Sequence, residues 1–344
     1  MINTKIYTIA SVEEGAAQLS EAAEMLRRGG LVVFPTETVY GLGGNATDAE
    51  AAKKIYAAKG RPSDNPLIIH IAHPEDAAAY AEVSPLYLQL AEAFMPGPLT
   101  VILPKKESIP HSVTGGLDSV AVRCPAHPVA HALIAAAGIP IAAPSANLSG
   151  KPSPTCAAHV IEDLSGRVDM IIDGGNCDIG LESTIIKIDG DHPILLRPGG
   201  ITLEQLETVC GPVEVAAAVI GQLAPGERPL SPGMMYRHYA PSTPLTLVRG
   251  ERSAVTAYLA ARQAEGCGIL CYAEDAALFA PENCIVLGHR SAPEEQAHHL
   301  FTALRDADEM STPHLYAPMP EETGMGLALC NRMLRAAAHT VIEL

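Results

Sequence analysis

Positively charged residues are scarce in this chain. Of its 344 residues, 23 are Lys or Arg and 39 are Asp or Glu, so the formal net charge is −16, and the acidic excess is spread across the chain. Proteins that bind nucleic acid generally need clustered cations to displace the counterions of the phosphate backbone. The composition therefore argues against a general nucleic-acid binder, but it still allows a local basic pocket for a nucleotide.

Closely paired cysteines and long apolar runs are also missing. The eight cysteines are scattered singly, with no CxxC, which is typical of structural thiols in a reducing cytosol. No apolar run approaches the ~18 residues of a membrane span, and the N-terminus lacks the pattern of a signal peptide. We therefore expect a cytoplasmic protein without a membrane segment, and the length suggests about two domains.

Residues 30–71 are the stretch around which we expect the chain to be organised. An apolar strand over 31–34 ends at three polar residues, 36–38, and a helix follows, with Thr47 and Glu50 as a capping box and a stop at 60–62. Lys59 and Arg61 then flank a glycine at the helix end, and His70 lies in the next apolar strand, 67–71. Ligands of α/β proteins usually bind where strands end, so we expect these polar groups to line one cleft.

The remaining pattern predicts an α/β fold with two domains. For residues 1–220 we expect a twisted mixed sheet with flanking helices, including helices over 12–28, 85–94 and 128–137 and strands over 99–103, 119–123, 139–143, 170–173, 183–188 and 194–197. Residues 221–244 are rich in Pro and Gly and read as a linker. Residues 245–344 predict a smaller Rossmann-like α/β domain, with strands near 245–248, 268–272, 284–287 and 314–317 and helices over 294–309 and 324–338. This domain has no GxGxxG, so we assign it no cofactor.

Six motifs in order carry a family resemblance. They are PTETVYGLG with KGRPSDNPLIIHI, PGPLT at 96–100, VAVRCP at 120–125, SAN at 145–147, EST at 182–184 and LRPG at 196–199. This set resembles the catalytic domain of threonylcarbamoyl-AMP synthases, the YrdC-like family. The segment SPGMMYRHYAP at 231–241 and the tail GMGLALCNRMLRAA are similar to the long, two-domain form of that family.

The resemblance implies an L-threonylcarbamoyladenylate synthase, a nucleotidyltransferase. Such an enzyme condenses L-threonine, bicarbonate or CO2, and ATP to threonylcarbamoyl-AMP and pyrophosphate. A separate tRNA transferase machinery then uses the product to make threonylcarbamoyladenosine (t6A). Mg2+ is expected to arrive on ATP, with no metal site of the protein's own.

The resemblance also implies roles for individual residues. Lys59 and Arg61 are the expected catalytic residues, with Arg61 on the nucleotide phosphates. The expected ATP-binding residues are Arg61, Asn65, Ser119, Ser145, Asn147, Ser153, Arg197, His238 and Tyr239. The expected threonine-binding residues are Thr38, His70, Arg123, Ala143 and Ser183, where Ala143 offers only its backbone.

Taken without the resemblance, several of these residues have plainer interpretations. Lys59 and Arg61 suit a helix C-terminus through the helix dipole alone, where we expect Arg61 to be exposed. A lone His70 in an apolar strand is more often a satisfied core histidine. His127 and His131 are spaced i, i+4 but lack a third ligand, so we interpret them as surface or capping residues.

The aromatic linker segment permits two interpretations. Two tyrosines, an arginine and a histidine at 236–239 are unlike a plain spacer. We expect the segment to cover the mouth of the catalytic cleft, with His238 or Tyr239 reaching the nucleotide, although its aromatics would also suit packing on one domain.

Two other functions remain open from the sequence. One is the carbamoyl-adenylate-forming domain of hydrogenase maturation proteins, whose zinc-finger and acylphosphatase segments this chain lacks. The other is an RNA-binding or ribosome-maturation module of the same fold, and direct tRNA binding stays undecided.

Overall fold

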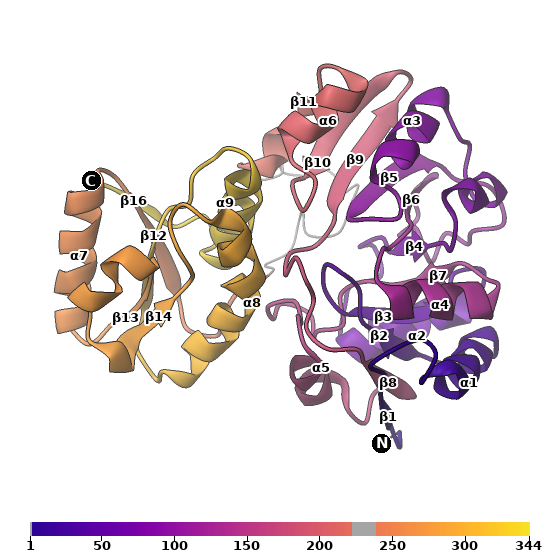
Figure 1. Cartoon of the computed structure of the whole chain (residues 1–344), viewed down its shortest axis with the longest axis horizontal. Coiled ribbons are helices and arrows are strands. Elements are labelled where there is room, and N and C mark those ends of the chain that lie inside the picture. Colours follow the sequence, from indigo (N-terminus) through magenta and orange to yellow (C-terminus); the bar gives the residue numbers. More distant parts are fainter. Residues whose placement is uncertain (1, 222–238) are drawn as a thin grey trace. The chain divides into compact units, whose positions relative to one another are not determined.

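The computed structural model describes residues 2–221 and 239–344 of the chain, which form two compact units (Figure 1). Two short segments from earlier in the chain, Gly150–Ser153 and Ile179–Leu181, cluster with the C-terminal unit. The α/β fold predicted from the sequence is confirmed in both units.

The N-terminal unit is built on one large mixed sheet. Its described residues form eleven strands, whose spatial order is β1 (Lys5–Thr8), β8 (Met170–Asp173), β2 (Val32–Phe34), β3 (Gly41–Asn45), β7 (Ile141–Ala142), β4 (Ile68–His70), β6 (Ser119–Arg123), β5 (Leu99–Pro104), β9 (Thr184–Asp189), β10 (His192–Arg197) and β11 (Glu214–Val215). Strand β4 runs parallel to β6 and antiparallel to β7. The carboxyl ends of β4 and β6 therefore lie together, and the carboxyl end of β7 lies beside the start of β4.

Helices cover both faces of this sheet. The helices of the unit are α1 (Ala16–Arg27), α2 (Ala49–Lys59), α3 (Pro85–Phe94), α4 (Pro128–Ala137), α5 (Ala157–Leu164) and α6 (Leu203–Cys210), with 3-10 turns η1 (Pro74–Ala79) and η2 (Ala217–Val219). Helices α1 and α4 lie side by side in Figure 1, and their apolar residues share one buried cluster with β2 and β8. Helix α2 packs over Gly44 through Ala51 and Ile55, on the face opposite the one that Gly43 presents to Phe34.

The structure corrects the predicted course of residues 30–60 in two places. The chain turns back after β2 and forms the antiparallel strand β3 before the helix, where the sequence analysis expected no second strand. A Cβ on Gly43 would lie 2.8 Å from both Phe34 and Ile141. Glycine, which in the sequence suggests a loop, is therefore needed here for close packing within the sheet. Helix α2 is capped by Asp48, whose side chain accepts the Glu50 N–H, and not by Thr47, which bonds to Asn45 instead.

Elsewhere in this unit several boundaries are confirmed. Helices α3 and α4 begin at prolines and β6 spans 119–123, all as predicted, and Thr202 and Gln205 form the expected capping box of α6. Helix α1 starts at Ala16, later than the predicted residue 12, and β7 keeps only two residues of the predicted 139–143.

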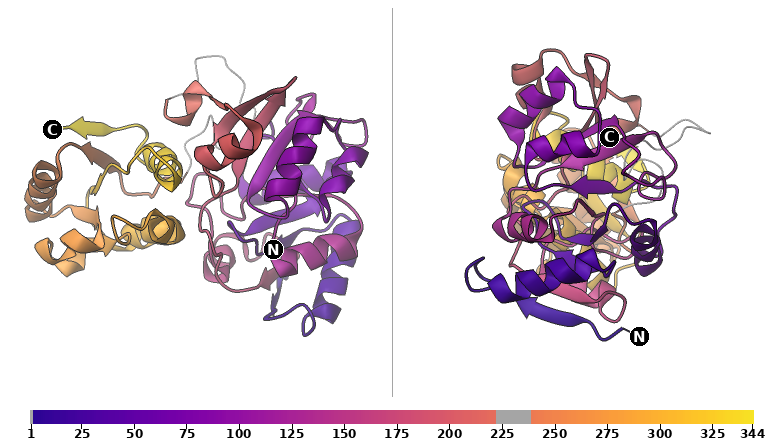
Figure 2. Two further views of the ribbon diagram at one scale, coloured as in Figure 1. Left: turned by 45° about the horizontal axis from the view of Figure 1, so that its top comes forward. Right: turned by 90° about the vertical axis from the view of Figure 1, so that its right-hand side faces the viewer.

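The C-terminal unit is a five-stranded parallel sheet between helices. Its strand order is β14 (Cys284–Val286), β13 (Gly268–Cys271), β15 (Leu315–Pro318), β12 (Leu245–Arg249) and β16 (Val341–Glu343). Helix α7 (Arg252–Ala264) packs on one face, and α8 (Pro293–Glu309) and α9 (Met325–Ala336) run side by side on the other (Figures 1 and 2). The 3-10 turns η3 (Ala273–Leu278) and η4 (Pro281–Asn283) join β13 to β14. Helix α7 and strand β16 were not located from the sequence.

Candidate active site

Lys59, at the last turn of α2, joins two motifs that are far apart in the sequence. Gly60 adopts φ +63°, the left-handed conformation that ends a helix at glycine. The Lys59 ammonium donates to the backbone oxygens of Ser145 and Asn147, and its Nζ lies 3.3 Å from Asn147 Oδ1. Ser145 Oγ donates to the same Asn147 Oδ1 at 2.6 Å. The KGR and SAN motifs therefore form one polar cluster.

Arg61 is buried, which corrects the expectation of an exposed helix-end cation. Its side chain is 8% exposed, its Nη2 donates to the Pro66 carbonyl at 3.1 Å, and its Nε lies 3.4 Å from the Asn65 carbonyl. The chain turns back over the guanidinium after α2 and thereby covers it. The dipole of the helix end alone does not explain a buried cation, because burial of a charge needs further partners.

Asn65 contributes an orphaned polar atom beside Arg61. Its side chain is 2% exposed, and its amide oxygen Oδ1 has no hydrogen-bond partner among the described residues. Buried polar atoms are almost always bonded, so an orphaned one suits a position that a ligand donor completes.

The other nucleotide candidates lie in three places. Ser119 begins β6 directly after a loop in which Val113 and Gly115 pack against residues 64–67, so it lies on the Arg61 side of the sheet. Ser153 is buried within the segment Gly150–Ser153. Tyr239 stacks on Phe301 of the C-terminal unit, with ring centroids 5.2 Å apart, whereas His238 lies outside the described residues.

A second polar cluster centres on Arg123 at the end of β6. Its Nη2 donates to Glu37 Oε1 at 2.7 Å, and both side chains are more than nine-tenths buried. Residues His70, Arg123 and Thr100 lie opposite one another on β4, β6 and β5. Thr100 Oγ1 and Ser183 Oγ form a 2.7 Å hydrogen bond, and Arg197 Nη2 donates to Ser183 Oγ at 3.2 Å.

The two remaining threonine candidates lie elsewhere: Thr38 follows β2, and Ala143 follows β7 at the end of β4 where Ile68 begins. Thr38 is fully buried and bonds to Thr36 Oγ1 at 2.9 Å. The Ala143 N–H is already used, because it donates to the Ile68 carbonyl at 2.9 Å. Only the Ala143 carbonyl is left to meet a ligand, which narrows the expected backbone contact.

Burial and the charge of Arg123 together set the charge states of Glu37 and His70. Burial pushes the pKa of the Glu37 carboxyl up, but the charge and hydrogen bond of Arg123 outweigh burial, so the pKa lies below its usual value. Burial, reinforced by the Arg123 charge, lowers the pKa of His70 to about 3. His70 is therefore neutral at pH 7, and because Ile141 O only accepts, the 3.3 Å contact makes His70 Nδ1 the donor. Its Nε2 is then an acceptor.

Glu37 and Thr100 belong to this cluster, although the sequence reasoning assigned neither of them. Glu37 was recognised only as a polar residue after a strand, and Thr100 only as part of the PGPLT motif. The available signal was that an arginine buried in an apolar strand requires an anionic partner, and the PTET motif contains one.

A close backbone approach fixes Ser183 in this cluster. A Cβ on Gly199 would lie 2.4 to 2.7 Å from backbone atoms of residues 182–184. The LRPG motif therefore needs glycine there so that the strand end carrying Arg197 can lie against the EST motif.

The two clusters lie at opposite ends of strand β4. Arg61, Asn65 and the end of β7 lie before Ile68, whereas His70 and Arg123 lie at the carboxyl ends of β4 and β6. The rise from Ile68 to His70 along the strand is about 7 Å. A distance of this size between the two clusters would let a small molecule in one cluster contact one end of a larger molecule bound in the other.

Other groups have structural explanations. His127 caps α4, with its Nδ1 accepting the Val129 N–H at 3.2 Å, as the capping interpretation predicted. Among residues 2–221 and 239–344, no group of three His, Cys, Asp or Glu side chains is placed to hold a metal ion. None of the described helices is long and apolar enough to cross a membrane.

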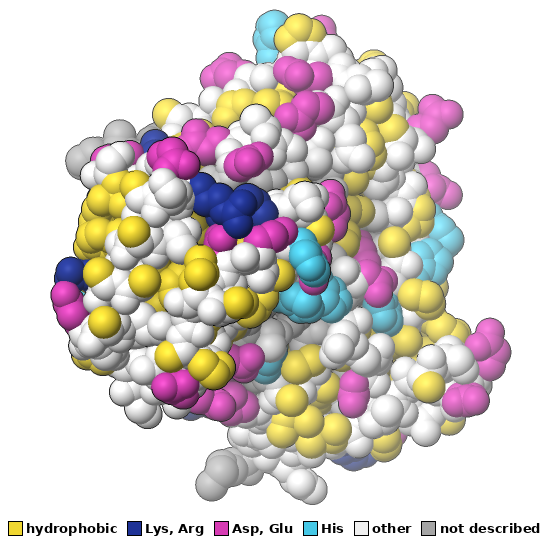
Figure 3. Space-filling view, turned by 60° about the vertical axis from the view of Figure 1, so that its left-hand side comes forward, with side chains coloured by type: hydrophobic (Ala, Val, Ile, Leu, Met, Phe, Trp, Pro, Cys, Tyr) yellow, Lys and Arg dark blue, Asp and Glu magenta, His cyan; other side chains and the backbone are white. Residues whose placement is uncertain are grey.

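The surface gives no sign of a broad basic area on the face shown in Figure 3. There, Asp and Glu side chains are scattered widely, and the Lys and Arg side chains form one conspicuous group. A nucleic-acid interface usually presents a continuous basic patch. The RNA-binding alternative thus gains no support from this face.

Comparisons with known proteins agree over nearly the whole chain. A family described as "Telomere recombination" matches residues 24–199, and one described as "Threonylcarbamoyl-AMP synthase, C-terminal domain" matches residues 201–338. The chain is 47% identical to the threonylcarbamoyl-AMP synthase of Bacillus subtilis, over 95% of this chain and 94% of that protein. It is also 47% identical to that of Pyrococcus abyssi, over 94% of each.

A solved structure extends this agreement to three dimensions. The crystal structure of P. abyssi Sua5 complexed with L-threonine superposes with a TM-score of 0.91 at 44% identity, covering 99% of this chain and 100% of that one. On these grounds the chain belongs to the threonylcarbamoyl-AMP synthase family, in its long, two-domain form.

Proposed function

We propose that this protein is an L-threonylcarbamoyladenylate synthase, a nucleotidyltransferase that makes threonylcarbamoyl-AMP from L-threonine, bicarbonate or CO2, and ATP. The observation that carries the proposal is the buried Arg123, paired with Glu37 beside the neutral His70 and the hydroxyls of Thr100 and Ser183. This constellation has a donor for the carboxylate that all amino acids share and an acceptor for the side-chain hydroxyl of threonine. The relative crystallised with L-threonine supports the assignment.

Arg123 is the proposed partner of the threonine carboxylate. Glu37 and the Gly97 carbonyl take its Nη2 and Nε, and its Nη1 donates to no described residue. A guanidinium nitrogen in a nearly closed site forms a charge-assisted bond to a carboxylate. We assign the threonine hydroxyl to His70 Nε2, because Nδ1 is already committed to Ile141. The substrate amine stays unbound in this arrangement and can react.

Lys59, Arg61 and Asn65 form the proposed nucleotide site. Oxygens of residues 145 and 147 position the Lys59 ammonium, and loop carbonyls hold the Arg61 guanidinium. Both cations suit phosphate oxygens, and the orphaned Asn65 oxygen suits a donor on the nucleotide. Ser119, Ser145 and Asn147 complete this site in the proposal, with Ser153, His238 and Tyr239 as further candidates. Arg197 stays a nucleotide candidate in the proposal, although it bonds to Ser183 in the Arg123 cluster.

The reaction needs positioning and charge neutralisation more than a covalent group of the protein. The threonine amine and CO2 form a carbamate, releasing a proton. A carbamate oxygen then attacks the α-phosphate, the bond to the β-phosphate breaks, and pyrophosphate leaves with its electron pair. Lys59 and Arg61 would offset charge that develops on the phosphates, and burial would protect the carbamate from water. Mg2+ bound to ATP would neutralise further phosphate charge.

Mass spectrometry of the product provides the direct test. The purified chain, incubated with L-threonine, ¹³C-bicarbonate, ATP and Mg2+, should yield adenylate that carries the labelled carbon, together with stoichiometric pyrophosphate. Unlabelled AMP as the only nucleotide product would contradict the proposal. In the cytoplasm, a separate tRNA transferase would then consume this labile product.

A further inference from the structure

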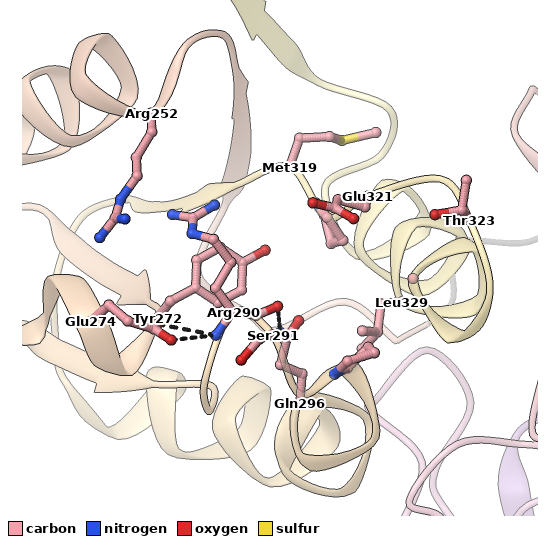
Figure 4. A pocket seen from close by; sticks show the side chains of 13 residues that line it. Arg252, Tyr272, Glu274, Arg290, Ser291, Gln296, Met319, Glu321, Thr323 and Leu329 are labelled. Atoms are coloured by element: carbon pink, nitrogen blue, oxygen red, sulfur yellow. Dashed lines mark hydrogen bonds between the residues drawn. The ribbon is translucent and has the colours of Figure 1, made fainter.

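The C-terminal unit contains a pocket of about 430 Å³ that the proposed synthase reaction does not use (Figure 4). Its lining comes from the chain just after four parallel strands, including Arg252 after β12, Tyr272 after β13, Arg290 after β14 and Met319 after β15. Open parallel sheets bind ligands at the carboxyl ends of their strands, where neighbouring connections diverge. The connections that leave β13 and β15 run to opposite edges of this sheet. The volume falls in the range of small-molecule sites.

One side of the pocket presents two arginines held by one buried acid. Asp275 is 6% exposed; its Oδ1 accepts from Arg252 Nη2 at 2.6 Å, and its Oδ2 accepts from Arg290 Nη2 at 2.9 Å. The Arg290 guanidinium also lies over the Tyr272 ring, 4.2 Å from its centroid. Two guanidinium groups share one carboxylate, so positive charge remains, and the buried Arg290 Nε has no hydrogen-bond partner among the described residues. This side is prepared for an anionic oxygen.

The opposite side has the opposite character. Figure 4 shows Glu321 and Thr323 across the pocket from the two arginines. The Glu321 carboxylate is exposed and takes part in no hydrogen bond within the described parts of the chain, whereas Glu274 already accepts the Arg290 backbone N–H at 3.0 Å. Leu329 adds apolar surface. The pocket is thus polarised, with cations at one end and a carboxylate at the other.

This polarity decides between classes of ligand. A phosphate dianion would meet two arginines but also the carboxylates of Asp275, Glu274 and Glu321. A small zwitterion adds no net charge, and it can place its anionic group on the two arginines and its cationic group on Glu321. We propose that this pocket binds a free α-amino acid, with its carboxylate on Arg252 and Arg290, its ammonium on Glu321 and its side chain against Met319 and Leu329.

The test is calorimetric titration of the full-length chain with each of the twenty protein amino acids. An Arg123→Ala background weakens the site assigned to threonine, so the remaining binding reports the C-terminal pocket whether or not the proposed synthase activity is correct. At least one amino acid should bind with one-to-one stoichiometry. Arg290→Gln and Glu321→Gln should each weaken it at least about tenfold through the loss of a charge-assisted contact.

Arg262→Gln is the matched control, because Arg262 also lies over a tyrosine ring, that of Tyr258, and pairs with an acid, Glu265, but lines no part of the pocket. It should leave the affinity unchanged. Because Glu321 is exposed and makes no hydrogen bond with the described residues, Glu321→Gln should fold normally. Its affinity for the amino acid then tests the proposed ammonium contact even if Arg290→Gln fails to fold.

Two results would overturn the inference. One is the absence of binding by all twenty amino acids at millimolar concentration. The other is binding of inorganic phosphate or AMP that Arg290→Gln abolishes and Glu321→Gln leaves intact or strengthens, because it would show an anion site and not a zwitterion site.

Discussion

Replacement of Glu37 by glutamine removes one charge from the buried pair with Arg123 and keeps nearly the same shape. Breaking a buried ion pair costs about 3–5 kcal/mol, because the other charge is left without compensation. Glutamine still offers an oxygen to Arg123, so we expect the free energy of unfolding to fall by about 2–4 kcal/mol. Chemical denaturation at pH 7 measures this change.

Glu24→Gln is the matched control within the same unit. Glu24 pairs with Arg27 at 2.8 Å, almost the distance of the buried pair, but both of these side chains are about two-fifths exposed. Exposed pairs contribute about 0–1 kcal/mol, so this variant should be nearly as stable as the parent. Glu24 also pairs with the exposed Arg28, so the control removes two exposed contacts and still tests the effect of burial.

Threonine gives the Glu37→Gln experiment its second measurement. If the threonine carboxylate binds Arg123, the ligand replaces the lost negative charge, and saturating L-threonine should raise the melting temperature more in the variant than in the parent. Equal stability of the Glu37 and Glu24 variants would refute the energetic argument. A destabilised variant that threonine fails to rescue would refute the assigned carboxylate site.

Four further changes test other parts of the site. Arg61→Ala should weaken ATP by at least about 1.5–3 kcal/mol and, because Arg61 is buried, should also lower the melting temperature; equilibrium binding of ATP and thermal melting measure the two effects. Arg123→Ala should raise the KM for threonine more than that for ATP, whereas equal losses would indicate a structural arginine. His70 is neutral in the folded chain, with a pKa of about 3 against ~6.5 unfolded, so its contribution is complete above pH 6.5 and falls as the pH drops toward 3. The parent should thus lose on the order of 1 kcal/mol of stability between pH 7 and 5.5 that His70→Gln does not lose in denaturation at the two pH values. Gly199→Ala should displace Ser183 and raise the KM for threonine; an unchanged KM and melting temperature would contradict the close approach.

Local signals in the sequence were sufficient for elements whose ends are set by backbone chemistry. Helices α3 and α4 begin at proline, and Gly138 ends α4 in the left-handed conformation, so their bounds were predictable. Strand β3 was not predictable, because its glycines lower strand propensity. They are explained by close tertiary neighbours, such as Phe34 and Ile141 at Gly43 and Ile55 at Gly44.

Tertiary contacts also decided what could be known of the site. The motifs named Lys59, Arg61 and Arg123, but the pairing of Glu37 with Arg123 joins residues 86 positions apart. The burial of Arg61 likewise depends on the turn that brings the carbonyls of residues 65 and 66 back over it. No local pattern encodes such contacts.

Strand β4 sets the distance between the proposed nucleotide site and the proposed threonine site. The three residues Ile68–His70 separate the cationic cluster from the Arg123 cluster, and backbone hydrogen bonds to β6 and β7 hold this separation. Side chains at either end can therefore change and alter which molecules are accepted, while the spacing at which the two substrates meet stays constant. Substitutions in one cluster could therefore change the specificity for the amino acid, and substitutions in the other could change the specificity for the nucleotide. The backbone would keep the relative position of the two substrates unchanged.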